Sequence, residues 1–153
     1  MEFNHRSYEK GQTIAAVATP PGEGGIAVVR IAGDRALEVA DQIFSGPIQS
    51  YASHTVHFGK IIDMEGNVID EGLAVVMKNP RSYTGEDTVE IHCHGGVIIT
   101  RKVLDAALKA GARAALFGHD AAMDEVAPQT RKGPWSAPDD MIAAVGPWGA
   151  VRG

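Results

Sequence analysis

The sequence predicts an α+β domain in which a mixed β-sheet is covered by flanking helices. Two observations indicate this class. Apolar runs of strand length are separated by loop and turn residues, and two longer stretches carry apolar residues at helical spacing. Along the chain, these stretches follow the order strand, strand, helix, hairpin of two strands, strand, helix. This order is typical of a sheet that is packed against helices.

The first half of the domain contains two predicted strands and one helix. Residues 13–19 (TIAAVAT) form an apolar run, and residues 26–33 (IAVVRIAG) form a second one that only Arg30 interrupts. The intervening PPGEGG is a loop, because its prolines lack backbone donors and its glycines permit positive φ angles. Residues 34–44 (DRALEVADQIF) have helical periodicity, and Asp34 is the expected helix cap.

The middle of the domain contains a predicted β-hairpin. Residues 55–62 (TVHFGKII) and residues 68–77 (VIDEGLAVVM) have the composition of strands. The five residues between them, DMEGN, contain Gly66 and Asn67, which are typical turn residues. A long loop, KNPRSYTGE, follows the hairpin.

The last predicted strand and helix lie next to each other in the sequence. Residues 87–93 (DTVEIHC) alternate, so that successive side chains point to opposite faces of the sheet. One face carries Val89, Ile91 and Cys93, and the other carries Thr88, Glu90, His92 and His94. Residues 95–111 (GGVIITRKVLDAALKAG) read as a helix that stops at Gly111. Its predicted buried stripe consists of Val97, Val103, Leu104, Ala107 and Leu108.

The chain divides into three predicted parts. Residues 13–117 form the folded domain, and residues 1–12 are a polar, flexible N-terminus. From residue 118 the sequence has scattered Pro, Gly and Trp with no sustained period. We therefore expect residues 118–153 to be a poorly ordered tail.

Composition limits the classes of function. The 153 residues are 44% hydrophobic, which favours a globular domain, and the net charge of -5 argues against a surface built to bind nucleic-acid phosphates. The single cysteine excludes an internal disulfide and fits a reducing compartment. The N-terminus lacks the apolar region of a secretory signal, and no apolar run is long enough to suggest a membrane span. We expect a cytoplasmic protein.

Polar and reactive residues are concentrated in PRSYTGEDTVEIHCHGG, residues 80–96. One interpretation is a small metal-dependent enzyme that uses His92, His94 and Glu90, because histidines two apart on a strand point the same way. The alternative is a polar strand face whose histidines bond to their neighbours. Cys93 is expected on the buried face, where a thiol is inert. No GxxxxGK[ST] motif occurs, so the sequence contains no P-loop. The HGG before the last helix could place backbone amides around an anion, or its glycines could let the strand turn tightly into the helix.

Arg30 is unusual because it lies within an apolar strand. An unpaired buried charge is costly, so Arg30 needs an acidic partner or an anionic ligand. The acidic candidates for such an ion pair are Asp70, Glu71, Glu86, Asp87 and Glu90. An organic ligand with a flat, nitrogen-rich ring and a carboxylate tail would also suit these residue types, because carboxylates accept ring N–H donors and arginine binds carboxylates. The residues alone leave these alternatives open.

Two long segments resemble a known family. TIAAVATPPGEGGIAVVRIAG and SYTGEDTVEIHCHGG, with the spacing between them, resemble the N-terminal domain of the bacterial MnmE (TrmE) family of tRNA modification GTPases. The resemblance implies a fold similar to the folate-binding domain of aminomethyltransferases. It also implies a homodimer that binds a tetrahydrofolate derivative, with 5-formyl-tetrahydrofolate as a stable stand-in.

The resemblance further implies a role in modifying the wobble uridine of certain tRNAs, together with the flavin-dependent partner MnmG (GidA). Proteins of this family also contain a helical domain and a G domain. Here the sequence after GARAA departs from the family pattern and reads LFGHDAAMDEVAPQTRKG. We therefore expect no GTPase activity from this chain alone.

Eight residues match the family motifs and are the predicted folate contacts. No metal is expected in this domain. The predicted contacts are Arg30, Tyr83, Thr84, Gly85, Glu86, Asp87, Glu90 and His94.

Overall fold

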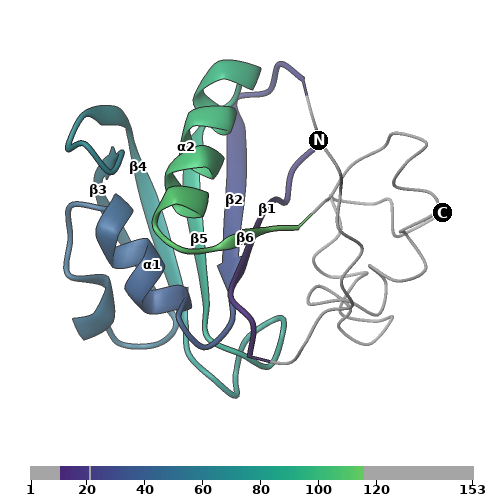
Figure 1. Ribbon diagram of the computed structural model, residues 1–153, viewed down its shortest axis with the longest axis vertical. Coiled ribbons are helices and arrows are strands. Elements are labelled where there is room, and N and C mark those ends of the chain that lie inside the picture. The colour runs from purple at the N-terminus through teal and green to yellow at the C-terminus, as the bar shows by residue number, and fades with distance from the viewer. Residues whose placement is uncertain (1–10, 21, 116–153) are drawn as a thin grey trace, which may run out of the picture.

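The computed structural model describes residues 11–20 and 22–115, which form one sheet with both helices on the same face (Figure 1). The strands are β1 (Ile14–Val17), β2 (Ile26–Ala32), β3 (Thr55–Ile62), β4 (Val68–Met77), β5 (Thr88–His94) and β6 (Arg113–Ala114). The helices are α1 (Ala36–Ile43) and α2 (Val97–Lys109), and a short 3₁₀ turn, η1, spans Ile48–Ser50.

The sheet is mixed, as predicted. Its six strands follow the order β3-β4-β5-β2-β1-β6. The β3–β4, β4–β5, β5–β2 and β2–β1 pairs are antiparallel, and β1–β6 is parallel. These strands and the two helices confirm the α+β class.

The hydrophobic core lies between the sheet and the two helices. From α1 it contains Ala36, Val39, Ala40 and Ile43, and from α2 it contains Val103, Ala106 and Ala107. The sheet contributes the predicted face of β5, where Val89 and Ile91 are fully buried. Full burial of one such aliphatic side chain stabilises the fold by about 1.5–3 kcal/mol.

The hairpin matches its predicted limits. Asp63 organises the turn, because its Oδ1 accepts hydrogen bonds from the backbone N–H groups of Glu65 and Asn67, each at 2.9 Å. Gly66 has a φ of 87°, a conformation that glycine adopts without steric cost. These interactions are local, which is why the sequence shows them.

The start of α1 differs from the prediction. The helix begins at Ala36, and its N-cap residue is Arg35 rather than Asp34. The backbone N–H of Arg35 donates to Thr13 Oγ1 at 2.8 Å. A side chain from a distant part of the sequence therefore satisfies this amide, and no local pattern could reveal it.

The predicted buried stripe of α2 is wrong at its first residue. Val97 is 61% exposed, and Leu104 and Leu108 are only partly buried. Val103 and Ala107 are buried as predicted, and Ala106 joins them. Gly111 follows the helix with a φ of 122°, which agrees with the predicted stop.

Smaller differences concern element limits. β5 spans Thr88–His94 instead of 87–93, and η1 and β6 were not predicted. No helix within residues 11–20 and 22–115 is long and apolar enough to cross a membrane. The expectations for residues 1–10 and for the tail from residue 118 fall outside the described ranges.

Candidate ligand-binding site

The sheet face opposite the helices carries a row of side chains across five strands. The strand register aligns Ala16 with Arg30, Arg30 with Glu90, Glu90 with Val75, and Val75 with Val56. Because side chains alternate along a strand, all five point to the same face. The two charged members of this row are therefore neighbours on β2 and β5.

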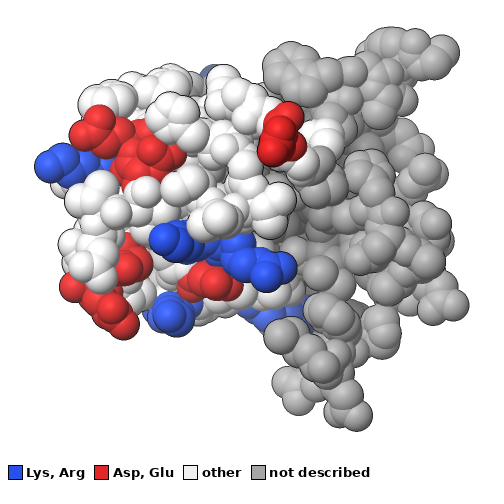
Figure 2. All heavy atoms as spheres, turned by 90° about the horizontal axis from the view of Figure 1, so that it is seen from above, with Lys and Arg blue, Asp and Glu red and all other residues white. Residues whose placement is uncertain are grey.

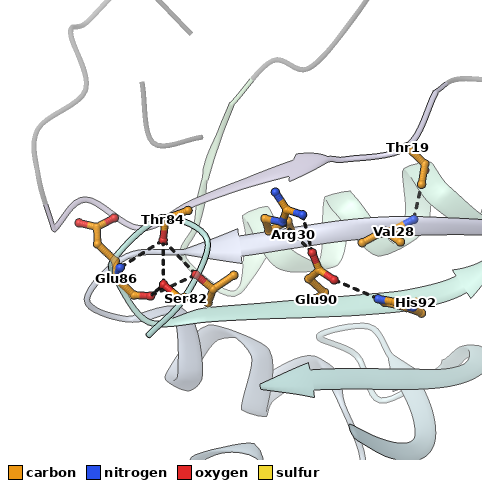
Figure 3. A network of polar contacts seen from close by, with 9 residues as sticks. Thr19, Val28, Arg30, Ser82, Thr84, Glu86, Glu90 and His92 are labelled. Carbon is orange, nitrogen blue, oxygen red and sulfur yellow. Dashed lines mark hydrogen bonds and ion pairs between the residues drawn. The ribbon is translucent and has the colours of Figure 1, made fainter. Parts of the chain in front are cut away.

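Arg30 and Glu90 form a buried ion pair (Figure 3). The Nη2 and Nε atoms of Arg30 donate to the same oxygen, Glu90 Oε2, at 2.5 and 2.8 Å. Only 4% of Arg30 and 8% of Glu90 is exposed. The sequence left open whether Arg30 has an acidic partner or an anionic ligand. In the structure Arg30 has an acidic partner, and that partner is Glu90.

The other carboxylate oxygen of Glu90 lies within hydrogen-bond distance of His92. His92 Nε2 lies 3.1 Å from Glu90 Oε1, and the side chain of His92 is 29% exposed. Burial by itself raises the pKa of Glu90, but the hydrogen bonds and charges of His92 and Arg30 outweigh it, so the pKa lies below the usual value. Glu90 is thus held ionised near the open face of the sheet.

Tyr83 borders this charged pair. The guanidinium carbon of Arg30 lies 5.1 Å from the centre of the Tyr83 ring, within the range of a cation–π contact. Tyr83 comes from the loop between β4 and β5 and is partly exposed. The loop therefore places one predicted site residue, Tyr83, next to two others on the sheet, Arg30 and Glu90.

The remaining predicted residues of this loop bond mainly within the domain. Glu86 Oε1 accepts the backbone N–H of Gly11 at 2.7 Å, and Asp87 Oδ1 accepts that of Asn79 at 2.9 Å. Thr84 Oγ1 lies 3.0 Å from the hydroxyl of Thr88. These contacts hold the loop against the end of the sheet.

Two further features shape the loop. Ser82 Oγ donates to the backbone oxygen of Glu86 (Figure 3). Gly85 has a φ of 76°, so its role is to let the chain turn. Glu86 is only 7% exposed. The acidic residues of the loop therefore contribute to its conformation, and among the predicted site acids it is Glu90 that faces the open side of the sheet.

His94 lies apart from this network, at the end of β5. Its Nδ1 is 2.9 and 3.0 Å from the two carboxylate oxygens of Asp70, and its backbone N–H donates to Asp70 at 2.8 Å. Burial by itself raises the pKa of Asp70. The hydrogen bonds from His94 lower this pKa by more than burial raises it, so the net shift is downward. Asp70 had been a candidate partner for Arg30, and no local pattern indicated its contact with His94.

The geometry does not support the metal-site interpretation. His92 bonds to Glu90, whereas His94 bonds to Asp70 on β4. Among the described residues, no group of three or more His, Cys, Asp or Glu side chains is arranged to hold a metal ion. Cys93 points to the helix-covered face, and burial raises the pKa of its thiol to about 11.

Exposed apolar side chains continue the open face toward β3. Leu73 is the register partner of His92, and Phe58 is the register partner of Leu73. Phe58 is 71% exposed, Val56 is 56% exposed, and Leu73 is 37% exposed. The sequence did not single out these residues, because in β3 the apolar side chains Val56 and Phe58 lie on the face away from the helices, in contrast to the usual alternation of a half-buried strand.

Charge is mixed on another side of the molecule. Figure 2 shows Lys and Arg side chains lying beside Asp and Glu side chains over the described part of that face. That view therefore shows no extended basic surface of the kind that binds nucleic-acid backbones.

Comparison with protein families identifies the domain. The family model for the N-terminus of the GTP-binding protein TrmE matches residues 13–119, which include both β2 and β5. The chain belongs to this family. A second model, for a family of unknown function (DUF6638), matches residues 98–153 and overlaps the first.

The chain also resembles curated bacterial proteins. It is 64% identical over 118 residues to a "tRNA modification GTPase MnmE" of Protochlamydia amoebophila, covering 77% of this chain and 26% of that protein. It is 55% identical over 109 residues to a protein of the same name from Chlamydia pneumoniae, covering 71% of this chain and 24% of that protein. The chain thus spans about a quarter of the length of the curated relatives it matches.

Proposed function

We propose that this domain binds a tetrahydrofolate derivative on the open face of its sheet and does so as a homodimer. The observation that carries the proposal is Glu90, an ionised acid that is almost buried and lies beside His92 on a face with exposed apolar side chains. A ligand that fits such a surface has a flat ring with N–H donors and an apolar body.

A reduced pterin has these properties. Its ring N–H groups and exocyclic amine can donate to Glu90 Oε1, which faces the partly exposed His92. The apolar surface of the ring would lie against the side chains beside His92, such as Leu73 and Val28, which are its register partners. The hydrogen bonds would fix the orientation of the ligand, and the apolar contact would contribute affinity.

Arg30 has a supporting role in this proposal. The Nε and Nη2 atoms of Arg30 both contact Glu90 Oε2, whereas Oε1 lies beside His92 and would accept hydrogen bonds from a ligand. Arg30 would therefore keep Glu90 charged and oriented. Direct binding of a folate carboxylate by Arg30 remains a prediction, and it would compete with this ion pair.

The activity of the whole protein is proposed from the names of its relatives. Because they are called tRNA modification GTPases, we propose that this domain belongs to a protein that acts on the wobble uridine of tRNA in the cytoplasm, with MnmG (GidA) as its partner. GTP hydrolysis and tRNA binding would reside in parts of the relatives that this chain does not match.

Isothermal titration calorimetry with 5-formyl-tetrahydrofolate tests the proposal. Wild-type protein should bind, and Glu90→Gln should weaken binding about 10- to 150-fold, the equivalent of about 1.5–3 kcal/mol for a charged hydrogen bond. Glu71→Gln is the matched control, because Glu71 is an exposed acid on the adjacent strand β4. Thermal melts of each variant establish that it is folded.

If Glu90→Gln does not fold, Tyr83→Ala provides the second variant. Tyr83 is partly exposed, so its truncation should leave the core intact and weaken a ligand that lies against the ring. Absence of measurable binding by a folded wild-type protein would contradict the proposal. Equal binding by wild type and by folded Glu90→Gln would exclude Glu90 as the recognising acid.

A further inference from the structure

His92 lies on the open sheet face beside an acid that can only accept hydrogen bonds. Its Nε2 atom is 3.1 Å from Glu90 Oε1, as Figure 3 shows. The pKa of Glu90 is lowered, so this carboxylate is ionised near neutral pH. An ionised carboxylate has no proton to donate. The hydrogen between the two side chains therefore belongs to His92 Nε2.

This contact determines the tautomer of His92. A neutral imidazole carries one N–H donor and one acceptor nitrogen, and the hydrogen bond at one nitrogen decides which is which. With the proton on Nε2, the acceptor of neutral His92 is Nδ1. Glu90 therefore selects a form of the ring that donates on one side and accepts on the other.

The Nδ1 atom of His92 is an acceptor that no described residue uses. The side chain is 29% exposed, and within residues 11–20 and 22–115 its ring makes no hydrogen bond other than the one to Glu90. The two nitrogens of an imidazole flank one carbon, so the lone pair of Nδ1 points away from a partner of Nε2. Neutral His92 thus adds a second acceptor to the site, next to Glu90 Oε1.

We propose that His92 is a second recognition residue of this site and that its Nδ1 atom accepts a hydrogen bond from the ligand. This inference rests on the proposed function, because the ligand is the tetrahydrofolate derivative proposed above. One N–H of the pterin would donate to Glu90 Oε1, and another would donate to His92 Nδ1. The register partners of His92, Val28 and Leu73, would support the ring from both sides.

Recognition through Nδ1 makes binding depend on the charge of His92. Histidine is the side chain that commonly changes charge between about pH 5 and 8. A protonated imidazole carries a hydrogen on both nitrogens, so Nδ1 could no longer accept a hydrogen bond. It would instead direct an N–H toward the N–H donors of the ligand. The ligand should therefore bind neutral His92 and should release a proton from the protonated form.

Other charged or titratable groups lie near His92 on the elements around it. They are Arg30 on β2, Asp70 and Glu71 on β4, Tyr83 in the loop before β5, and Glu90 and His94 on β5. The pKa of Glu90 is lowered from 4.5, so Glu90 stays ionised at about pH 5.5. His94 is the second histidine in this group, so an experiment must separate its titration from that of His92.

Isothermal titration calorimetry with 5-formyl-tetrahydrofolate at about pH 8 and about pH 5.5 tests the inference. Wild type should bind about 2- to 12-fold more weakly at the lower pH, the range for one hydrogen bond. His92→Leu should show this weaker binding already at about pH 8, because it has no acceptor. His92→Gln should bind more tightly than His92→Leu, because its amide offers one donor for Glu90 and one acceptor for the ligand. Neither variant should keep the pH dependence of wild type.

Two further histidine variants serve as controls. His54→Asn removes an exposed histidine that precedes β3, and asparagine tolerates the φ of 64° at this position. It should keep both the affinity and the pH dependence of wild type. His94→Gln should keep the pH dependence, because His94 bonds to Asp70 rather than to Glu90. Loss of the pH dependence in His94→Gln would overturn its assignment to His92. Thermal melts at both pH values establish that each variant is folded.

The ¹⁵N chemical shifts of the imidazole test the tautomer without a ligand. Long-range ¹H–¹⁵N spectra of the free protein at about pH 8 should show His92 protonated at Nε2 and unprotonated at Nδ1. Saturation with 5-formyl-tetrahydrofolate should then shift the Nδ1 signal, because its lone pair accepts a hydrogen bond. The opposite tautomer, or an Nδ1 signal that does not move in the saturated protein, would overturn the inference.

The outcomes distinguish this inference from the proposed function. Wild-type binding that is equal at both pH values, or tighter at the lower one, would overturn the role of His92 and leave folate binding intact. Tighter binding by folded His92→Leu would also overturn it, because His92 would then compete with the ligand for Glu90. Absence of binding by folded wild type at either pH would overturn the proposed function, and this inference with it.

Discussion

Arg30 on β2 lies directly opposite Glu90 on β5, and its Nη2 and Nε atoms share one oxygen of that carboxylate at 2.5 and 2.8 Å. The pair joins two central strands that are 60 residues apart in the sequence. It also lies on the face that the helices leave open, so it contributes both to the stability of the sheet and to the chemistry of the proposed site.

Removal of Arg30 should destabilise the domain. Arg30→Ala leaves Glu90 as a buried charge without its cationic partner, which typically costs about 3–5 kcal/mol. Arg30→Lys should lose less, because the charge remains but the two-nitrogen contact does not. Urea unfolding monitored by circular dichroism measures both effects.

Arg35→Ala provides the control for this prediction. Arg35 pairs with Glu38 on the surface, where the two side chains are 55% and 52% exposed. Solvent screens such pairs, so the change in unfolding free energy should be much smaller than for Arg30→Ala. If the two alanine variants lost equal stability, the structural importance of the buried pair would be refuted.

Acid should weaken the fold through Glu90. Its pKa is lowered in the folded protein relative to the usual value of 4.5, so the unfolded chain takes up the proton first as pH falls. The stabilisation from ionised Glu90 is therefore present above about pH 4.5 and is lost as pH falls through the lower, folded pKa.

Urea unfolding at a series of pH values measures this dependence. Glu90→Gln should unfold with a shallower dependence on pH below 4.5 than wild type. Asp70, Glu38 and Asp63 also have lowered pKa values, so part of the acid sensitivity should persist in Glu90→Gln. An unchanged slope in Glu90→Gln would show that Glu90 does not contribute.

The sequence predicted the elements whose causes are local. The hairpin from Thr55 to Met77 was located to the residue, because its strands alternate and Asp63 and Gly66 shape the turn between them. The buried face of β5 was also predicted from alternation alone. In both cases the physical cause lies within a few residues of its effect.

Interactions between distant segments could not be predicted in this way. The pairing of Arg30 with Glu90 depends on the register of β2 and β5, and Glu90 was one of several acidic candidates. The contact between Asp70 and His94 and the Thr13 side chain at the start of α1 have the same origin. The sequence indicated that Arg30 needs an acidic partner or an anionic ligand. The strand register of the sheet determines that this partner is Glu90.

Cys93 should react slowly in the folded protein. It is 4% exposed, and burial raises the pKa of its thiol to about 11, so little thiolate is present near neutral pH. Alkylation by iodoacetamide at pH 8, followed by mass spectrometry, should be slow in buffer and rapid in urea. Rapid alkylation of the folded protein would contradict the buried position of Cys93 on the helix side of β5.

The central claim is that a reduced folate binds on the open sheet face at Glu90. The most direct test is a titration of ¹⁵N-labelled protein with 5-formyl-tetrahydrofolate, followed by amide chemical shifts. The largest changes should occur at Val28, Tyr83 and residues 90–92, with small changes along the exposed side of α2. Shifts confined to the helix side, or no shifts in a folded protein at millimolar ligand, would contradict this account.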